Sequence, residues 1–268
     1  MDSRQPQEGL LRRIAPEASL LLGAGRAILL QLAEPRIGTA VVRHSNFVAD
    51  PLSRLHNTLA YVYALGAGNE RQRERVVNFV DAAHRPVHAP RDPRHGTPAY
   101  SARDPRLQAW VAATLYDSAT LAARLTLPAL EANDEEALYR EYAALGSALQ
   151  MPEGFWPADR AEFERYFQQM LGQLQVTEEV RQPADELFTG RHAPWWIRAV
   201  LPLVRDATIA QLPPRVRELY GYRLTPTVRR RYGAVVRVLR TANRVLPRAV
   251  RHAPMHYSLR RIDKGRLG

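Results

Sequence analysis

The chain has 268 residues, of which 46% are hydrophobic and 24% charged, and it contains no cysteine. This balance suits a globular protein with a sizeable core, and the missing cysteines exclude disulfides, iron–sulfur clusters, cysteine-based zinc sites and thiolate catalysis. The net charge of +11 comes entirely from the segment that begins at Val228, where twelve basic residues oppose only Asp263, so residues 1–227 are neutral overall.

The sequence predicts neither a membrane-spanning nor a secreted protein. A transmembrane helix needs about 20 consecutive apolar residues, and the longest apolar stretch, LLLGAGRAILLQLA at 20–33, is interrupted by two glycines and Arg26. The N-terminal stretch MDSRQPQEGLLRR lacks the apolar core of a signal peptide. We therefore expect a cytoplasmic protein, for which peripheral contact with a membrane remains open.

Helical periodicity recurs along the whole chain, whereas extended period-two alternation and Asn-Gly or Asp-Gly turns are missing. Several helix starts pair a capping residue with a proline, at Asp50-Pro51, Asp104-Pro105 and Thr225-Pro226. Helices are predicted at 17–34, 36–45, 51–66, 69–85, 104–126, 134–149, 159–173, 176–187, 193–210, 213–219 and 225–245. The proline-rich stretch at 89–105 is predicted to be a loop. The fold class is therefore all-α, a single-domain helical bundle.

The helix expected at 51–66 has a polar face beside an apolar one. Its apolar stripe consists of Leu52, Leu55, Leu59 and Val62. The adjoining polar positions are Arg54, Asn57, Thr58 and Tyr61. A guanidinium, an amide and a hydroxyl therefore converge there, whereas His56 points away from them. The pattern fits either a binding surface or a solvated polar flank.

The following helix carries a histidine, His84, on its apolar side. The stripe recurs at three- and four-residue spacing through Val76, Val80, Ala83, His84 and Val87. An imidazole at such a position is either a satisfied core residue or a ligand. His84 and His88 are also four residues apart, a spacing that can bind a metal directly. However, Pro86 disfavours a regular turn between them, and no third ligand is evident nearby.

The helix expected from Pro105 contains Trp110, Thr114 and Asp117 at three- and four-residue spacing, so these side chains can share a face. By itself this pattern indicates only a helix.

Six segments, taken in order, resemble one known family. They read GRAILLQLAEP, HSNFVADPLSRLHNTL, AHRPVH, YSARDP, WVAATLYDS and LPPRVRELYG, and they span roughly residues 20–225. The order is similar to that of the haem-dependent oxygenases that include the latex-clearing (rubber-cleaving) proteins and the fungal oxygenase that trims the side chain of mycophenolic acid. The resemblance implies an all-helical, haem-binding domain at 1–227, followed by a basic C-terminal helix and tail at 228–268.

The resemblance also implies roles for individual residues. His84, in an H-x-x-V segment, corresponds to the proximal ligand of the iron in a b-type haem, a role that suits a neutral imidazole. The distal wall, with the catalytic positions, corresponds to Arg54, Asn57 and Thr58, of which Arg54 and Thr58 would face dioxygen or a haem propionate. The family-typical segments near the cofactor also contain Arg26 and Thr114.

Two positions depart from the family pattern. Rubber-cleaving members carry a lysine at the position of Asn57, where it can cap the iron, and an amide is a much poorer ligand for iron than an amine. Ala112 stands where the family usually has a histidine. Neither departure touches His84, but together they give no support to a rubber-type substrate.

These observations predict a haem b-dependent oxygenase that acts on an apolar small molecule, such as an isoprenoid, a lipid or a natural-product intermediate, with dioxygen or peroxide. The alternative is a non-enzymatic carrier or sensor that binds haem or an apolar ligand. A basic interaction module that has lost haem is a third possibility.

The predicted C-terminal helix has an apolar stripe flanked by arginines, formed by Val228, Tyr232, Val235 and Leu239. Such a helix could lie on an anionic membrane surface, or it could pack on the body of the protein with its arginines in water. We expect no specific nucleic-acid partner, because the segment has neither a helix-turn-helix signature nor aromatic residues interleaved with its charges.

Overall fold

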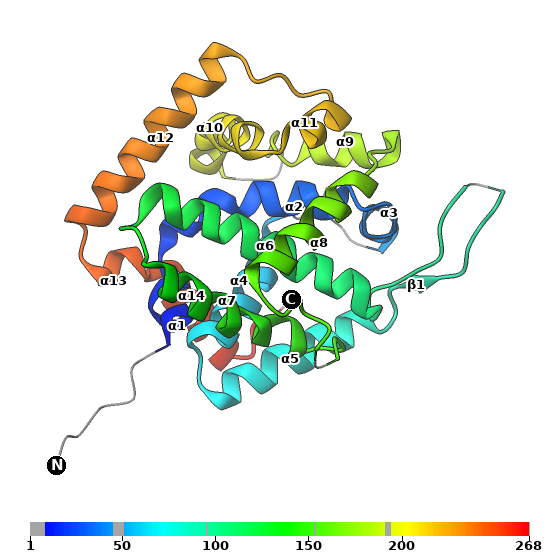
Figure 1. Cartoon of the computed structure of the whole chain (residues 1–268), viewed down its shortest axis with the longest axis horizontal. Coiled ribbons are helices and arrows are strands. Elements are labelled where there is room, and N and C mark those ends of the chain that lie inside the picture. Colours follow the sequence, from blue (N-terminus) through cyan, green and yellow to red (C-terminus); the bar gives the residue numbers. More distant parts are fainter. Residues whose placement is uncertain (1–8, 45–50, 95, 153, 191–193, 268) are drawn as a thin grey trace.

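The computed structural model describes residues 9–44, 51–94, 96–152, 154–190 and 194–267, apart from the side chains of 51–54 and 144–145 (Figure 1). Helices account for nearly all the regular structure in these ranges, and the prediction of an all-α protein is confirmed. No helix in the described ranges is long and apolar enough to cross a bilayer.

The N-terminal half contains α1 (Leu10–Ile14), the 3₁₀-helix η1 (Ala18–Gly23), α2 (Ala24–Leu32), α3 (Pro35–His44), α4 (Pro51–Ala67), α5 (Glu70–His84), β1 (His88–Ala89), β2 (Tyr100–Ser101) and α6 (Pro105–Thr126). The C-terminal half contains α7 (Ala132–Ser147), α8 (Arg160–Gln173), α9 (Glu178–Glu186), α10 (Trp195–Gln211), α11 (Pro214–Tyr220), α12 (Pro226–Val245), α13 (Arg248–Arg251) and α14 (Ala253–Asp263).

Helix α6 is the central element, and η1, α2, α7 and α12 pack around it (Figure 1). It begins where the sequence predicts, because the Asp104 side chain accepts a hydrogen bond from the Arg106 amide at 2.9 Å and Pro105 occupies the first turn. More than half of its 22 residues are buried, including Trp110. The helix therefore supplies much of the core on which the other helices are placed.

Helices α4 and α5 form a helical hairpin. Gly68 and Asn69 join them, and the side chain of Asn69 forms a reciprocal capping box with Gln72 at the start of α5. Ala64 of α4 and Val76 of α5 are both fully buried within one small cluster. This hairpin places the two predicted site helices side by side.

Four features differ from the predicted elements, and the first is α1, a short helix that the sequence did not predict. The single helix expected at 17–34 is divided into η1 and α2, and the division falls at Gly23, where the backbone lies so close to the Ser118 carbonyl that a Cβ atom would overlap it. The loop at 89–105 contains a short antiparallel pair, with His88 opposite Ser101. Helices α13 and α14 follow the predicted C-terminal helix, and α14 packs on α4 and α5.

Candidate functional site

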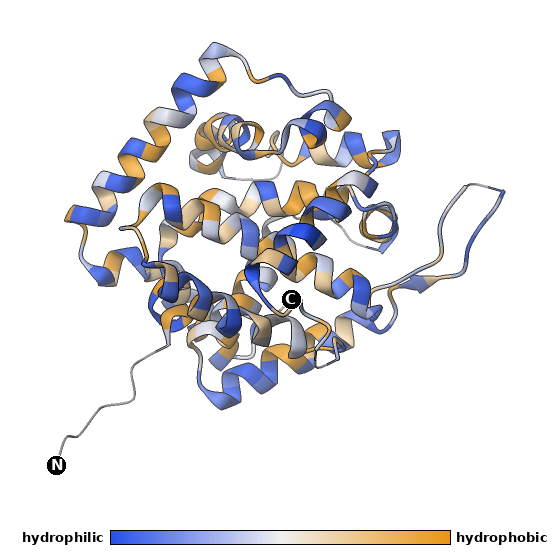
Figure 2. Cartoon of the chain, viewed as in Figure 1, coloured by the Kyte–Doolittle hydropathy of each residue, from blue (hydrophilic) through white to orange (hydrophobic). Residues whose placement is uncertain are grey.

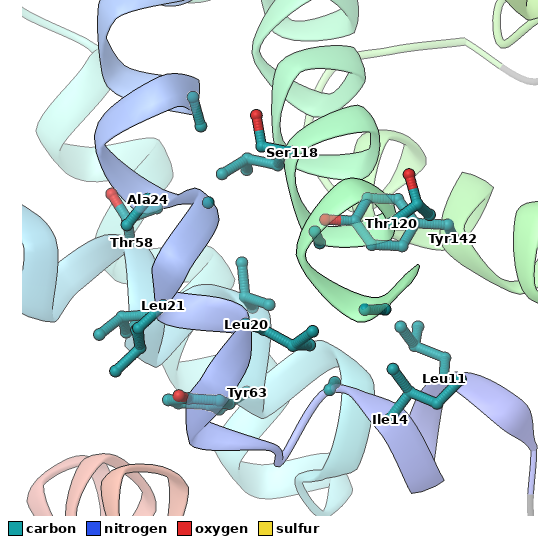
Figure 3. A pocket seen from close by; sticks show the side chains of 18 of the residues that line it. Leu11, Ile14, Leu20, Leu21, Ala24, Thr58, Tyr63, Ser118, Thr120 and Tyr142 are labelled. Carbon is teal, nitrogen blue, oxygen red and sulfur yellow. The ribbon is translucent and has the colours of Figure 1, made fainter. Parts of the chain in front are cut away.

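One pocket stands out in the described part of the molecule. Residues of α1, η1, α2, α4, α6 and α7 surround about 980 Å³ of space, part of which is open to solvent (Figure 3). Most of the lining is aliphatic, and the polar lining side chains are those of Gln31, Thr58, Tyr63, Ser118, Thr120 and Tyr142. No charged side chain among the described residues lines this pocket, so this lining suits an uncharged, largely apolar ligand.

Helix α4 contributes much of one wall. Leu55, Leu59 and Val62, three members of the predicted apolar stripe, line the pocket together with Thr58. Their spacing brings them onto one side of the helix. Thr58 therefore presents a hydroxyl within an apolar wall, and its role in a distal wall stays a prediction.

The other predicted polar positions of α4 are arranged differently. Asn57 and Tyr61 are half-buried and lie outside the pocket lining. The side chain of Arg54 lies outside the described residues, although the backbone at this position is helical. His56 points away, as predicted, and its ring lies 6.1 Å from that of Tyr257 on α14. Of the predicted polar group, the structure thus places Thr58 at the pocket.

Two tyrosines, Tyr63 of α4 and Tyr142 of α7, line the pocket (Figure 3). Burial raises the pKa of Tyr63 to about 12. Burial also raises the pKa of Tyr142 above its ordinary value. Both phenols are therefore neutral near pH 7 and can donate or accept hydrogen bonds without adding charge to the pocket.

His84 is the last residue of α5 and is half-buried, but it does not line the pocket. The predicted stripe is partly correct, because Val76 is buried and Val80 is half-buried, whereas Ala83 is exposed. The buried line follows the four-residue spacing from Val76 through Val80 to His84, and Ala83 falls outside it. The imidazole thus sits at the end of the helix that packs on α4.

The pair His84 and His88 is not part of a larger ligand cluster. His88 lies on β1, is exposed, and its Nδ1 is 3.2 Å from the Arg85 carbonyl oxygen. Among the described residues, no group of three or more histidine, aspartate, glutamate or cysteine side chains could hold a metal ion. This arrangement gives no support to a site in which the protein supplies all the ligands.

Arg26 is buried in the core rather than at the pocket. Its guanidinium forms an ion pair with Asp117 of α6 and donates to the Ser118 hydroxyl and to the Gln211 carbonyl, both at 2.9 Å. Burial raises the pKa of Asp117, and the charge of Arg26 opposes this effect. These bonds join α2 to α6 and α10, and a cofactor-binding role for Arg26 remains a prediction.

Thr114 and Trp110 occupy the same interface. The fully buried Thr114 hydroxyl accepts a hydrogen bond from Gln31 at 2.9 Å, and the indole of Trp110 donates to the Leu30 carbonyl at 3.2 Å. The predicted shared face of α6 therefore packs against α2. Gln31 also lines the pocket, so Thr114 contacts a lining side chain without lining the pocket itself. Its predicted contact with a cofactor stays a prediction.

Ala112, where the family usually has a histidine, is buried and lies outside the pocket lining. A Cβ atom added to Gly146 of α7 would lie 3.6 Å from the Cβ of Ala112, so the two helices approach closely here. The small side chain of Ala112 permits this close approach of α6 and α7.

The sequence analysis missed the walls formed by α1 and η1. Leu11 and Ile14 of α1, with Leu20 and Leu21 of η1, line the pocket. The leucine run at 20–22 is visible in the sequence, but a continuous helix through it would direct its side chains differently. Only the change to a 3₁₀-helix, which has three residues per turn, brings these leucines to the pocket.

Comparison with known proteins identifies the family. A model of the catalytic domain described as "ER-bound oxygenase mpaB/B'/Rubber oxygenase" matches residues 11–241. The chain belongs to this family. It is therefore related to oxygenase catalytic domains, which confirms the resemblance seen in the six sequence segments.

Two mycobacterial proteins are similar to most of this family member. Uncharacterised proteins of Mycobacterium bovis and Mycobacterium tuberculosis are each 33% identical to it over 225 residues, which cover 82% of this chain and 87% of each relative. No solved structure matches significantly.

Proposed function

We propose that the protein is a haem b-dependent oxygenase that acts on an apolar small molecule with dioxygen or peroxide. The observation that carries this proposal is the pocket with no charged side chain in its described lining, which receives Thr58 from the helix that folds back on the one bearing His84. An isoprenoid, a lipid or an apolar natural-product intermediate matches the aliphatic lining, and membership of an oxygenase family supports the reaction class.

The donor chemistry of the chain fits haem. The macrocycle supplies four nitrogens to the iron, so the protein needs to contribute only one axial ligand, and His84 can do so without a larger cluster of ligands. The aliphatic side chains of α2, α4 and η1 suit the apolar part of a substrate. When bound, haem would supply the oxidative chemistry, and the protein would control ligation, polarity and access.

We propose roles for the protein's own residues from the resemblance to the oxygenase family. His84 would hold the iron through one ring nitrogen, and a hydrogen bond at the other nitrogen would set the basicity of the imidazole. The Thr58 hydroxyl would orient the oxygen co-substrate, and we assign Arg54 and Asn57 to the same distal wall. Neutral Tyr63 would add a hydrogen bond without attracting water as a charged group does.

The first test is the absorption spectrum of the protein expressed with a haem precursor, followed by pyridine extraction to identify the macrocycle. We expect one b-type haem per chain. His84→Ala should lose haem while its circular dichroism stays helical, because the iron loses its protein ligand. Thr58→Ala is the matched comparison and should retain haem but change the rate of the reaction with oxygen. Normally ligated haem in His84→Ala would refute the assignment of the ligand.

A carrier or sensor is the second candidate function, and one observation favours it. Among the described residues no charged side chain lines the pocket, so this lining offers no carboxylate or imidazole as a general acid or base. Oxygen consumption with a reductant and a set of apolar substrates distinguishes the two functions. Haem without any turnover across this set would favour the carrier.

A further inference from the structure

Helix α10 is covered by protein along only half of its length. Its second half is buried, with Asp206, Ala207, Thr208 and Ile209 packed inside the molecule. Its first half exposes large apolar side chains, namely Trp195 (79% exposed), Trp196 (58%), Val200 (48%), Leu203 (42%) and Val204 (43%). Two exposed tryptophans in one turn are unusual for a surface that meets only water.

The exposed apolar residues form one continuous face. At 100° per residue, Trp195, Trp196, Val200, Leu203 and Val204 fall within about half of the helical circumference. Ile197 and Leu201, which are half-buried, lie on the side toward the core. The first half of α10 is therefore apolar on both sides, a pattern that indicates a second covering partner.

The neighbouring helix α12 carries the complementary feature, a stripe of arginines. Helices α10 and α12 pack on each other, and Arg231 forms an ion pair with Asp206 at 3.1 Å. Arg230, Arg237 and Arg244 recur every seven residues, so they lie along one side of α12. All three are exposed, and none forms an ion pair with a carboxylate in the described part of the chain.

A line of valines runs beside these arginines. Val238 and Val245 each follow an arginine of the stripe by one residue and are 67% and 69% exposed. Figure 2 shows the resulting alternation of hydrophilic and hydrophobic bands along α12. Unpaired cations bordered by apolar side chains are the composition that an anionic lipid surface attracts.

We propose that the exposed face of α10, together with the arginine stripe of α12, binds the surface of an anionic membrane. Tryptophan suits the boundary between headgroups and acyl chains because its ring is apolar and its N–H is polar. The arginines would meet lipid phosphates and carboxylates while their aliphatic stems remain beside the valines. The protein would then lie on one leaflet without crossing it.

The charge on this surface favours lipid over a second copy of the chain. A two-fold dimer would bring the same patch into contact with itself. Helix α12 contains no acidic residue, and the one acid of α10, Asp206, is buried against Arg231. Self-association would thus place unpaired arginines near one another, whereas an anionic bilayer supplies the opposite charge.

This surface is linked to the pocket through the same helix. The second half of α10 packs on α2 and η1, which form two walls of the pocket. A protein held on a bilayer by the first half of α10 would keep its apolar pocket close to a store of apolar molecules. The membrane proposal does not depend on haem, so it can be tested separately from the proposed function.

The experiment measures binding of the full-length protein to vesicles of phosphatidylcholine with and without about 30% phosphatidylserine. Co-sedimentation gives the affinity. A shift in tryptophan emission reports contact between the helix and the lipid, because Trp195 and Trp196 are exposed while Trp110 and Trp156 are buried. We expect binding to the anionic vesicles only, a blue shift of the emission, and weaker binding as salt rises.

Two variants separate the contribution of the tryptophans to vesicle binding from that of the arginines. Trp195→Ala/Trp196→Ala should bind anionic vesicles at least about tenfold more weakly and lose the blue shift. The triple variant Arg230→Glu/Arg237→Glu/Arg244→Glu should lose the preference for phosphatidylserine. Matched controls lie elsewhere on the surface. Phe155→Ala removes an aromatic ring that is 42% exposed, and Arg91→Glu/Arg94→Glu reverses charges in the exposed loop; both should bind like the wild type.

Three results would overturn the proposal. One is equal binding to neutral and anionic vesicles by the wild type, and another is unchanged binding by both surface variants. The third is a blue shift that depends on protein concentration without lipid, accompanied by a dimer in light scattering that the tryptophan variant abolishes. That result would identify the face as an interface between two copies of the chain.

Discussion

At the scale of single residues, Arg26 shows how a charge is kept inside the core. Its side chain is 7% exposed and that of Asp117 is 24% exposed, so water screens this ion pair only weakly. Removing one partner of such a pair costs more than replacing both, because a charge is left buried alone. The pair also connects α2 with α6, so its loss would weaken the packing between these two helices.

We expect Arg26→Met to destabilise the protein by about 3 kcal/mol near neutral pH. The pKa of Asp117 is already raised above its ordinary value of 3.8, and it should rise further without the guanidinium. The folded state then holds this proton more tightly than the unfolded chain does, so the contribution of Asp117 to stability falls as the pH rises from about 3.8 through the raised pKa.

Chemical denaturation at several pH values measures this effect. The difference between Arg26→Met and the wild type should be smaller near pH 4.5 than near pH 7, because protonation neutralises Asp117. The double variant Arg26→Met/Asp117→Leu should recover part of the lost stability at pH 7. A pH-independent difference would contradict the assigned pair.

At the scale of elements, glycines set the distance between α2 and its neighbours. Gly25 faces α10, where an added Cβ atom would overlap the hydroxyl oxygen of Thr208. Thr208 is buried and β-branched, so its side chain has little freedom to turn away. The segment GAGR thus combines close helix packing with a buried charge.

We expect Gly25→Ala to destabilise the protein by about 2 kcal/mol, because overpacking outweighs the gain in helix propensity. Thr208→Ala should relieve much of this cost, which a double-mutant cycle from urea denaturation would show as a coupling energy. Gly172→Ala is the control, since a Cβ atom there meets open space. Additive effects of Gly25→Ala and Thr208→Ala would argue against the close approach.

At the scale of the whole molecule, the basic C-terminal segment holds two distant parts of the chain together. Ile262 of α14 is fully buried with Ala60, Ala64 and Val76 of the α4–α5 hairpin. On the other side, Arg251 and His252 contact the buried carboxylate of Glu17 just before η1. The segment therefore supports both the hairpin that carries His84 and the 3₁₀-helix that lines the pocket.

We expect Ile262→Ala to reduce the free energy of unfolding by about 3 kcal/mol, as for other buried large-to-small substitutions. The affinity for haem should fall as well, because α4 and α5 lose the helix that packs on them. Val250→Ala is the control, since this valine is 53% exposed. Thermal and urea unfolding measure the first effect. A wild-type stability for Ile262→Ala would mean that α14 is not part of the cooperative fold.

Apolar spacing and capping residues act locally, so they were enough to predict the helical class and most helix positions, and six ordered segments indicated the family. The sequence also placed Leu55 and Leu59 on one apolar stripe of α4 and Thr58 on the adjoining polar face, since neighbours on a helix follow from its period. The spacing of Arg54, Asn57 and Thr58, by contrast, did not say which of these side chains lines a pocket. Only the tertiary structure decided that Thr58 faces the pocket while Asn57 lies outside its lining.

Other properties depended on contacts between segments far apart in the chain. Arg26 pairs with Asp117, and Ile262 packs on the α4–α5 hairpin. No local sequence pattern encodes these contacts. The sequence also did not predict the exposed face of α10, because the same apolar stripe occurs on helices that protein covers and on helices that it leaves exposed. Its two tryptophans become a surface feature only when the folded chain leaves them uncovered.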